Sequence, residues 1–308
     1  RTIGGTTRNS AFSKSGGLSL RSQRIHQGQN NYGNSGYLSA YFGFVNHYVM
    51  FLRFCLPAVL LLCSISCSTS KKMQPSLVLP FQKYSIKDPV QQEVDEIYAL
   101  LTYSLVYANW QSGDIPRTKR RGYNIGALLV DKNKQPVYYG LNCINSTDNA
   151  TQHGEVRAIT TYLEKTRIFN LDGFTMYTSL EPCIMCAGMM TMTDVDRVVY
   201  GQKDVDFSNG LERLALDTRA YGGYAPFKRT TWPDPAPNEI RTRLDEAYRN
   251  FLATETEKIL AKFLASAEAE AIFKDAHDAF LKFQPKNSVN AVVYEGALQF
   301  FKDNKTAK

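Results

Sequence analysis

The chain has 308 residues, 44% hydrophobic and 21% charged, which is an ordinary globular composition with enough length for one or two domains with a core. Its net charge of +7 would suit a nucleic acid or a membrane surface, but residues 1–75 hold eight basic and no acidic residues. Residues 76–308 therefore carry 28 basic against 29 acidic residues, a formal charge of about −1. This part lacks the basic excess that binding to a phosphate backbone requires.

The N-terminal 49 residues are rich in Gly, Ser and Asn, have no acidic residue and show no apolar period. Such a composition cannot bury enough apolar surface to offset the entropy lost on ordering. The first methionine is Met50. We interpret residues 1–49 as a disordered leader or upstream sequence, with a genuine basic tail as the alternative.

Residues 50–67 have the layout of a signal peptide: a charged start at Arg53, a short apolar stretch and small residues before Cys67. The segment "SISC" is similar to a bacterial lipoprotein box, in which Cys67 would be the lipidated residue. We therefore expect an exported lipoprotein held at a membrane through its N-terminus. A transmembrane anchor and a cytoplasmic protein remain alternatives. Residues 68–87 are expected to be a linker.

The first predicted element after this linker is a helix that begins at Asp88 and Pro89, a capping residue followed by proline at the first helical position. An apolar stripe at spacings of three and four supports it (Val90, Val94, Ile97, Leu101, Leu105). Residues 123–131 then read as a buried strand, "KNKQ" as a turn and residues 136–142 as a second, antiparallel strand.

Helices and strands alternate in the middle of the chain. Residues 153–165 are predicted to form a helix, 174–180 a strand, 182–192 a helix and 196–201 a strand. Strands separated by helices favour parallel pairing, whereas the opening hairpin favours one antiparallel pair. The predicted fold class is α/β: a three-layer α/β/α sandwich with a mixed sheet. The stretch that holds "WPDPAPN" is expected to be loop, and residues 235–308 a helical extension with no visible chemistry.

Six cysteines are present, and they do not have the spacing of a disulfide framework. Cys143 is expected to be a buried thiol. Cys183 and Cys186 form a C-x-x-C pair at a predicted helix start, where both sulfurs share one face and the helix terminus favours the thiolate. Taken alone, such a pair could equally be a redox motif or two buried thiols.

The stretch "HGE" supplies the residues that the cysteine pair lacks. His153 and two thiolates give three zinc ligands, which leaves the fourth position open as in catalytic zinc sites. Zinc in such a site lowers the pKa of a bound water to about 7. Glu155 is then the natural proton carrier rather than a ligand. A lone histidine before a helix is more often a cap or core residue. The interpretation as a zinc site therefore depends on the combination of His153 and Glu155 with the cysteine pair.

The joint pattern H-x-E…P-C-x-x-C is the signature of zinc deaminases. Residues 88–215 resemble the cytidine deaminase-like superfamily. Four segments carry this resemblance, in the expected order: "YNIGALLVD", "HGEVRAI", "SLEPCIMCAGMM" and "DRVVYG". "LEPCIMCAGMM" is most similar to the tRNA adenosine and guanine deaminases, and "HGE" to fungal-type cytosine deaminases. After Asp204, the run of small residues and glycines usual in tRNA-acting members is replaced by "DFSNGLERL".

The resemblance implies a role for each matching residue. His153, Cys183 and Cys186 correspond to the ligands of Zn²⁺, and Glu155 to the proton shuttle. Asn142 matches an asparagine that contacts the substrate base, although a strand-end turn residue is the alternative. The backbone near Ala127 and Gly154 is expected to line the pocket.

We therefore predict a zinc-dependent hydrolase that deaminates a free nucleobase or nucleoside, of the purine or cytosine type. A tRNA adenosine deaminase and a non-catalytic lipoprotein that only binds ligands are the alternatives. The expected partners are a small-molecule base or nucleoside and a membrane, and a nucleic acid is not expected. The sequence leaves open whether the protein forms a homodimer. The basic segment "RTKRR" at residues 117–121 could contact phosphate, but it fits a solvated loop better.

Overall fold

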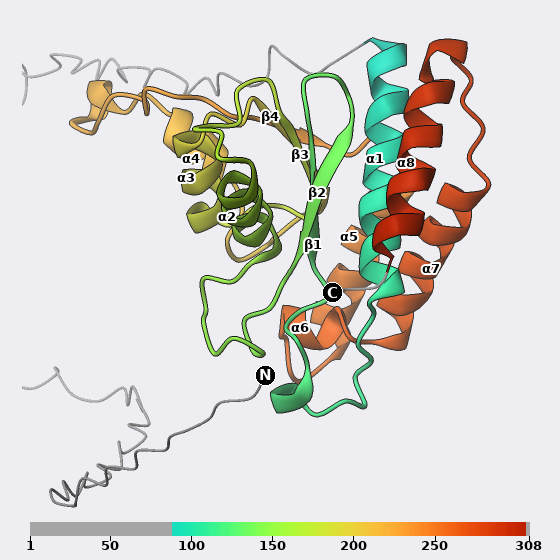
Figure 1. The fold of residues 1–308 in the computed structure, drawn as a ribbon. Coiled ribbons are helices and arrows are strands. Elements are labelled where there is room, and N and C mark those ends of the chain that lie inside the picture. The colour runs from blue at the N-terminus through green and yellow to red at the C-terminus, as the bar shows by residue number, and fades with distance from the viewer. Residues whose placement is uncertain (1–87, 306–308) are drawn as a thin grey trace, which may run out of the picture. The chain divides into compact units, whose positions relative to one another are not determined.

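The computed structural model describes residues 88–305, and these form a sheet covered by helices on both faces (Figure 1). The leader, the signal-like segment with Cys67, and the linker of the sequence analysis lie outside the described residues. Within the described part, no helix is both long and apolar enough to span a membrane.

The sheet has five strands in the order β2-β1-β3-β4-β5. Their bounds are β1 Gly126–Val130, β2 Pro136–Leu141, β3 Thr175–Leu180, β4 Arg197–Gln202 and β5 Trp232–Pro235. Strand β1 pairs antiparallel with both β2 and β3, while β3–β4 and β4–β5 are parallel. The mixed sheet and the antiparallel hairpin of β1 and β2 are confirmed, and the antiparallel pairing of β1 with β3 is an addition that the sequence did not predict. Strand β1 lies between β2 and β3 in the sheet. The helical connection from β2 to β3 therefore joins two parallel strands that are not neighbours.

The segment "WPDPAPN", which the sequence analysis expects to be loop, contains strand β5. Its Pro233 and Pro235 cannot donate ladder hydrogen bonds, which is tolerated on an edge strand. The amide of Trp232 donates to the carbonyl of Asp196, and the amide of Ala236 donates to the carbonyl of Tyr200. These two hydrogen bonds, from the first residue of β5 and from the residue that follows the strand, therefore hold β5 against β4.

Alternation along β1 places side chains on the two faces of the sheet. Leu128 and Val130 belong to the hydrophobic core on one face, and Ala127 and Leu129 to the core on the other. Helices α2 (Gly154–Thr166), α3 (Ile184–Met192) and α4 (Gly210–Ala215) cover the second face (Figure 1). The predicted helix at 153–165 is thus confirmed to within one residue.

Helix α1 (Pro89–Ala108) covers the first face and begins as predicted, with the side chain of Asp88 accepting a hydrogen bond from the amide of Val90. Nearly all of its residues from Glu93 to Val106 are buried, because α1 lies between the sheet and the C-terminal helices. Those helices are α5 (Glu239–Thr254), the short α6 (Leu260–Phe263), α7 (Ala267–Leu281) and α8 (Ala291–Asn304). The extension therefore shares one apolar core with α1 and the sheet.

Candidate zinc and catalytic site

The two cysteines and the histidine stand at the starts of neighbouring helices. His153 is the N-cap residue of α2 and Cys183 that of α3, and neither side chain caps its own helix. Cys186 lies one turn further along α3 and is buried. Pro182 precedes the N-cap, so α3 begins two residues later than the helix predicted at 182–192. Both side chains at the caps remain available for a ligand.

The three ligand atoms have the spacing of a tetrahedral zinc site. Sγ of Cys183 and Sγ of Cys186 are 3.7 Å apart, and Nδ1 of His153 lies 3.7 Å and 3.5 Å from them. Bonds of about 2.3 Å to sulfur and 2.0–2.1 Å to nitrogen imply about 3.8 Å between sulfurs and about 3.6 Å between sulfur and nitrogen. These residues are also the group of possible metal ligands found within the described part of the chain. His153, Cys183 and Cys186 form a zinc site.

The electrostatics of this triad favour a thiolate at Cys183, whereas the hydrogen bond with Cys183 and burial raise the pKa of the Cys186 thiol. The pKa of the Cys183 thiol is lowered to about 4, chiefly by its hydrogen bond with Sγ of Cys186 and also by the neighbouring His153. The hydrogen bond to Cys183 also raises the pKa of His153. Zinc binds the thiolate and the neutral imidazole, so metal binding would release the protons of Cys186 and His153.

Glu155 lies in the first turn of α2, two residues from the histidine, and is 3% exposed. Burial raises the pKa of its carboxyl group. Its Oε2 atom is buried and accepts no hydrogen bond from the described residues. A buried carboxylate oxygen beside three metal ligands suits a group that exchanges a proton with a metal-activated water.

Glu155, His153 and Cys183 line a cavity of about 650 Å³, which we call the zinc pocket. Asn142 also lines it, and its Oδ1 accepts hydrogen bonds from the amides of Tyr123 and Ile144 at 3.1 and 3.4 Å. The side-chain oxygen of Asn142 thus binds backbone amides near the end of β2, while Nδ2 of Asn142 makes no hydrogen bond with the described residues. Asn142 combines the turn role and the pocket position that the sequence left as alternatives.

Ala127 and Gly154 do not line the zinc pocket, and their roles toward a substrate stay predictions. Ala127 is buried in the core beneath α2. A Cβ atom on Gly154 would lie 2.9 Å from the carbonyl oxygen of Gly140 and 3.3 Å from the amide nitrogen of Ala127. Glycine at 154 therefore lets α2 begin directly against β1 and β2, which brings Glu155 to the ligands.

One wall of the zinc pocket comes from the C-terminal extension, where the sequence showed no chemistry. Residues 258–261, between α5 and the first turns of α6, line it together with Tyr123 and Phe207. No motif marks this segment, because its position depends on how α7 packs on α1 and how α5 packs on α7 and β4.

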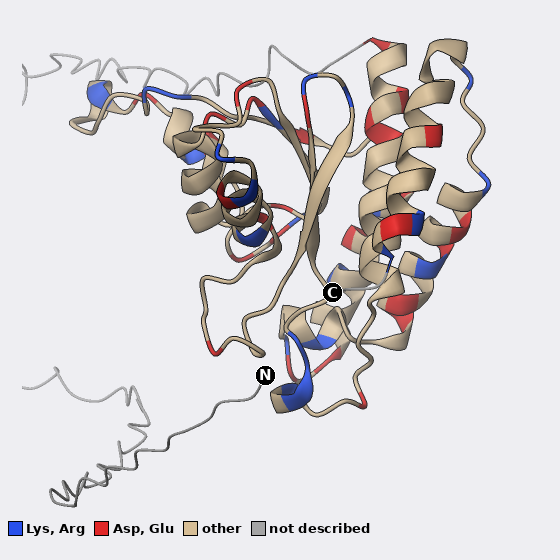
Figure 2. Ribbon diagram, viewed as in Figure 1, with Lys and Arg blue, Asp and Glu red and all other residues tan. Residues whose placement is uncertain are grey.

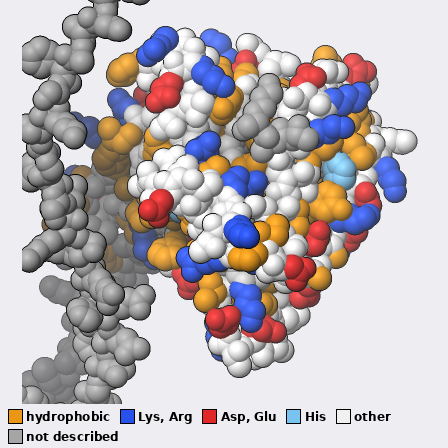
Figure 3. Space-filling model, turned by 60° about the horizontal axis from the view of Figure 1, so that its bottom comes forward, with side chains coloured by type: hydrophobic (Ala, Val, Ile, Leu, Met, Phe, Trp, Pro, Cys, Tyr) orange, Lys and Arg blue, Asp and Glu red, His pale blue; other side chains and the backbone are white. Residues whose placement is uncertain are grey.

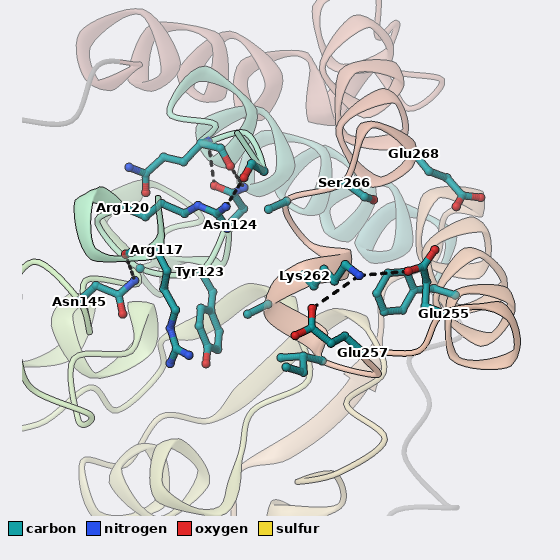
Figure 4. Close-up of a pocket in the computed structure, with 17 residues that line it drawn as sticks. Arg117, Arg120, Tyr123, Asn124, Asn145, Glu255, Glu257, Lys262, Ser266 and Glu268 are labelled. Carbon is teal, nitrogen blue, oxygen red and sulfur yellow. Dashed lines mark hydrogen bonds and ion pairs between the residues drawn. The ribbon is translucent and has the colours of Figure 1, made fainter. Parts of the chain in front are cut away.

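A second cavity of about 540 Å³ adjoins the zinc pocket and shares Tyr123, Ile259 and Ala261 with it. Figure 4 shows Arg117 and Tyr123 on one side of this cavity and Lys262 between Glu255 and Glu257 on the other. The guanidinium of Arg120 is occupied by the carbonyl oxygens of Ile115 and Gly113. Part of the "RTKRR" segment therefore lies near the site, in surroundings of mixed charge.

Comparison with known proteins agrees with this geometry. The profile of the cytidine and deoxycytidylate deaminase zinc-binding region matches residues 113–202. A tRNA-specific adenosine deaminase 2 from Xenopus laevis is 38% identical over 91 residues, which cover 27% of this chain and 50% of that protein. The enzyme of the same name from Xenopus tropicalis is 40% identical over 141 residues, covering 39% of this chain and 82% of that one.

A solved structure from work on A-to-I editing by tRNA:A34 deaminases has 24% identity and a TM-score of 0.31, covering 37% of this chain and 78% of that one. The profile match includes His153, Glu155 and both cysteines, and the C-terminal extension lies beyond it. The chain spans half the length of the Xenopus laevis relative and most of the Xenopus tropicalis one. The chain belongs to the cytidine and deoxycytidylate deaminase zinc-binding family.

Proposed function

We propose that the protein is a hydrolase that deaminates a free nucleobase or nucleoside. The observation that carries the proposal is the placement of Glu155, with an unpartnered buried oxygen, in the pocket that His153 and Cys183 line, beside the buried third ligand Cys186. A module that only binds ligands has no use for a buried carboxylate at this position, because burying it costs free energy.

The reaction exchanges an amino group on a ring carbon for the oxygen of water and releases ammonia. Zinc held by the three ligands would supply a water whose pKa is lowered to about 7. Glu155 would carry one proton of this water to a ring nitrogen and the second to the leaving amine, which departs as ammonia. The free Nδ2 of Asn142 would donate a hydrogen bond to the base and so orient it in the pocket.

Charge around the pocket favours a small substrate over a polyanion. Glu181, Asp204 and Asp206 line the zinc pocket, against a single lysine, Lys258. Residues 88–305 hold 25 basic and 29 acidic residues, a formal charge of −4. Basic and acidic residues alternate over the ribbon and over the face shown in space-filling form, without a broad basic area (Figures 2 and 3). Such a surface offers few of the phosphate contacts that RNA binding requires.

An adenosine within tRNA is the second candidate substrate. It is favoured by the tRNA-specific adenosine deaminases among the relatives, one of them 40% identical over 141 residues. Arg117, which lines the adjoining cavity, is the basic residue best placed to meet a phosphate beyond the base.

Ammonia release from a panel of purine and pyrimidine bases and nucleosides tests the proposal, with a tRNA anticodon stem-loop as the competing substrate. We expect turnover of a base or nucleoside that changes little between about 50 and 200 mM salt. Inert bases and nucleosides together with salt-sensitive deamination of the stem-loop would favour the second candidate. Inertness toward every substrate in a zinc-loaded protein would contradict deamination itself.

A further inference from the structure

A third cavity, of about 220 Å³, lies at the edge of the sheet, and we call it the edge cavity. Strand β2 is an edge strand of the sheet, and its residues Tyr138 to Leu141 form the floor of the cavity. Helix α2 contributes Arg157, Thr161 and Lys165, and the end of α8 contributes Asn304. The edge cavity shares no lining residue with the zinc pocket.

The charged residues that line the edge cavity are all basic. Arg121, Arg157 and Lys165 line it, and none of its lining residues is Asp or Glu. Arg157 and Lys165 stand eight residues apart on α2, about two helical turns, so both face the same side. This distinguishes the edge cavity from the cavity beside the zinc pocket, where cations and carboxylates occur in equal numbers.

Arg121 is half-buried and has no carboxylate partner among the described residues. Its Nε donates to the carbonyl oxygen of Asn142 at 2.9 Å and its Nη1 to that of Asn109 at 3.3 Å. Its Nη2 is buried and has no hydrogen-bond partner. Burial and the neighbouring Arg157 lower the pKa of this guanidinium. A partly buried cation without a counter-charge is destabilising, and an anion beside it would offset the cost.

The other two cations are also free of ion pairs within the described residues. Nη1 of Arg157 donates to the side-chain oxygen of Gln152 at 3.1 Å, and Nζ of Lys165 lies 4.8 Å from the centre of the Tyr138 ring. Both contacts hold the side chains near the cavity without neutralising them. Three cations thus meet at one small cavity, and no protein carboxylate balances them there.

We propose that the edge cavity binds the phosphate group of a small molecule, either inorganic phosphate or a phosphate monoester. Guanidinium groups bind phosphate oxygens through paired, charge-assisted hydrogen bonds, and lysine adds a point charge. The rings of Tyr138 and Tyr139 border the cavity and would contact whatever the phosphate carries. This site is separate from the proposed deaminase reaction and does not depend on it.

Binding can be measured on the full chain, in phosphate-free buffer, by calorimetry and by the shift of the melting temperature with inorganic phosphate. Sodium chloride at matched ionic strength corrects for general screening. The test variant is Arg157→Ala/Lys165→Ala, and Arg121 is left in place because it holds the carbonyl of Asn142. The matched control, Arg213→Ala/Lys228→Ala, removes the same two charges at exposed positions outside the cavity.

We expect wild type and control to bind phosphate alike, and the test variant to bind at least about tenfold more weakly. If that variant is unfolded by circular dichroism, Arg157→Gln and Lys165→Met retain the side-chain stems, and each should weaken binding. Tighter binding of a nucleoside monophosphate than of inorganic phosphate would identify a phosphate monoester as the ligand, and equal binding would identify phosphate itself. No phosphate-dependent shift in wild type, or equal affinity in folded test and control variants, would overturn the proposal.

Discussion

Gly140 on strand β2 contacts the first turn of α2 at Gly154. A Cβ atom on Gly140 would collide with the carbonyl oxygen of Gly154 and lie 2.8 Å from the amide nitrogen of Ala158. Two glycines thus let a helix and a strand approach at backbone distance. Because His153 and Glu155 flank Gly154, this contact fixes where the metal ligand and the proton carrier stand relative to the sheet.

The substitution Gly140→Ala should therefore destabilise the fold by about 1–3 kcal/mol, the usual cost of overpacking, and displace the start of α2. Zinc content and the melting temperature of the purified protein measure both effects. Gly188→Ala on α3 is the control, because a Cβ there meets no atom within 4 Å. That change should be neutral or stabilise by about 0.5–1 kcal/mol. Equal stability of the two variants would refute the role given to Gly140.

A buried ion-pair network connects α1 to the far edge of the sheet. Arg197 on β4 donates to both carboxylate oxygens of Asp95 at 2.8 and 2.7 Å and to Asp234 on β5 at 2.6 Å. Asp95 also accepts a hydrogen bond of 2.8 Å from the hydroxyl of Tyr177. Removal of the arginine would leave two carboxylates without their partner, one of them 2% exposed.

We expect Arg197→Met to lower the free energy of unfolding by about 3–5 kcal/mol, as measured by urea denaturation. Arg219→Met is the matched control, because its ion pair with Asp217 is exposed. That control should leave the unfolding free energy unchanged. A loss in Arg197→Met no larger than in the control would show that the network contributes no stability.

Glu93 on α1 holds the turn before α8. Its carboxylate accepts hydrogen bonds from the amides of Lys286 and Asn287 and from the side chain of Asn290. Although burial opposes ionisation, these bonds lower the net pKa of Glu93 below 4.5. A lowered folded-state pKa stabilises the protein above the unfolded-state pKa, and the stabilisation is lost as the pH falls through the folded value.

Glu93→Gln should therefore lower the unfolding free energy by about 1.5–3 kcal/mol near pH 7, and the difference from wild type should shrink at about pH 3. Glu96 on the same helix is the control, because burial raises its pKa. Its charge is unfavourable near neutral pH, so Glu96→Gln should not destabilise there. A constant difference between Glu93→Gln and wild type from neutral to acid pH would rule out the charged carboxylate as the cause.

Membrane attachment through Cys67 is a prediction from the sequence, and this residue lies outside the described part of the chain. If Cys67 is lipidated, Cys67→Ser should move the protein from the membrane fraction to the supernatant, because the acyl chains provide the anchor. Cys143→Ser controls for the loss of a thiol. Unchanged membrane association would indicate an uncleaved anchor, and a protein found unprocessed in the cytoplasm would contradict export.

The zinc ligands and most strands were predictable because their signals are local. The C-x-x-C spacing, His153 before a helix and the continuous apolar run in β1 each depend on neighbouring residues only. Strand β5 was not predictable from the sequence, because Pro233 and Pro235 suppress the usual strand signal. Its pairing with β4 also depends on the tertiary fold.

Long-range contacts explain the other omissions. Residues 258–261 reach the zinc pocket only because the helices around them pack on α1, more than 150 residues earlier in the chain. Likewise, Arg121 lies in the loop before β1 and Lys165 lies on α2, and only the packing of α2 on β2 brings them to one cavity. Hydrophobic periodicity predicts that such helices exist but not which cavity their ends line.

The central claim is that Glu155 moves protons in a zinc-dependent deaminase without binding the metal. The most direct test is Glu155→Gln, with zinc content measured by atomic absorption and turnover by ammonia release on the substrate found with wild type. We predict about one zinc per chain in both proteins and a loss of turnover of at least about 10²-fold in the variant, since general acid–base catalysis contributes about 10²–10⁴-fold. Loss of zinc together with turnover, or full turnover with zinc retained, would contradict the account.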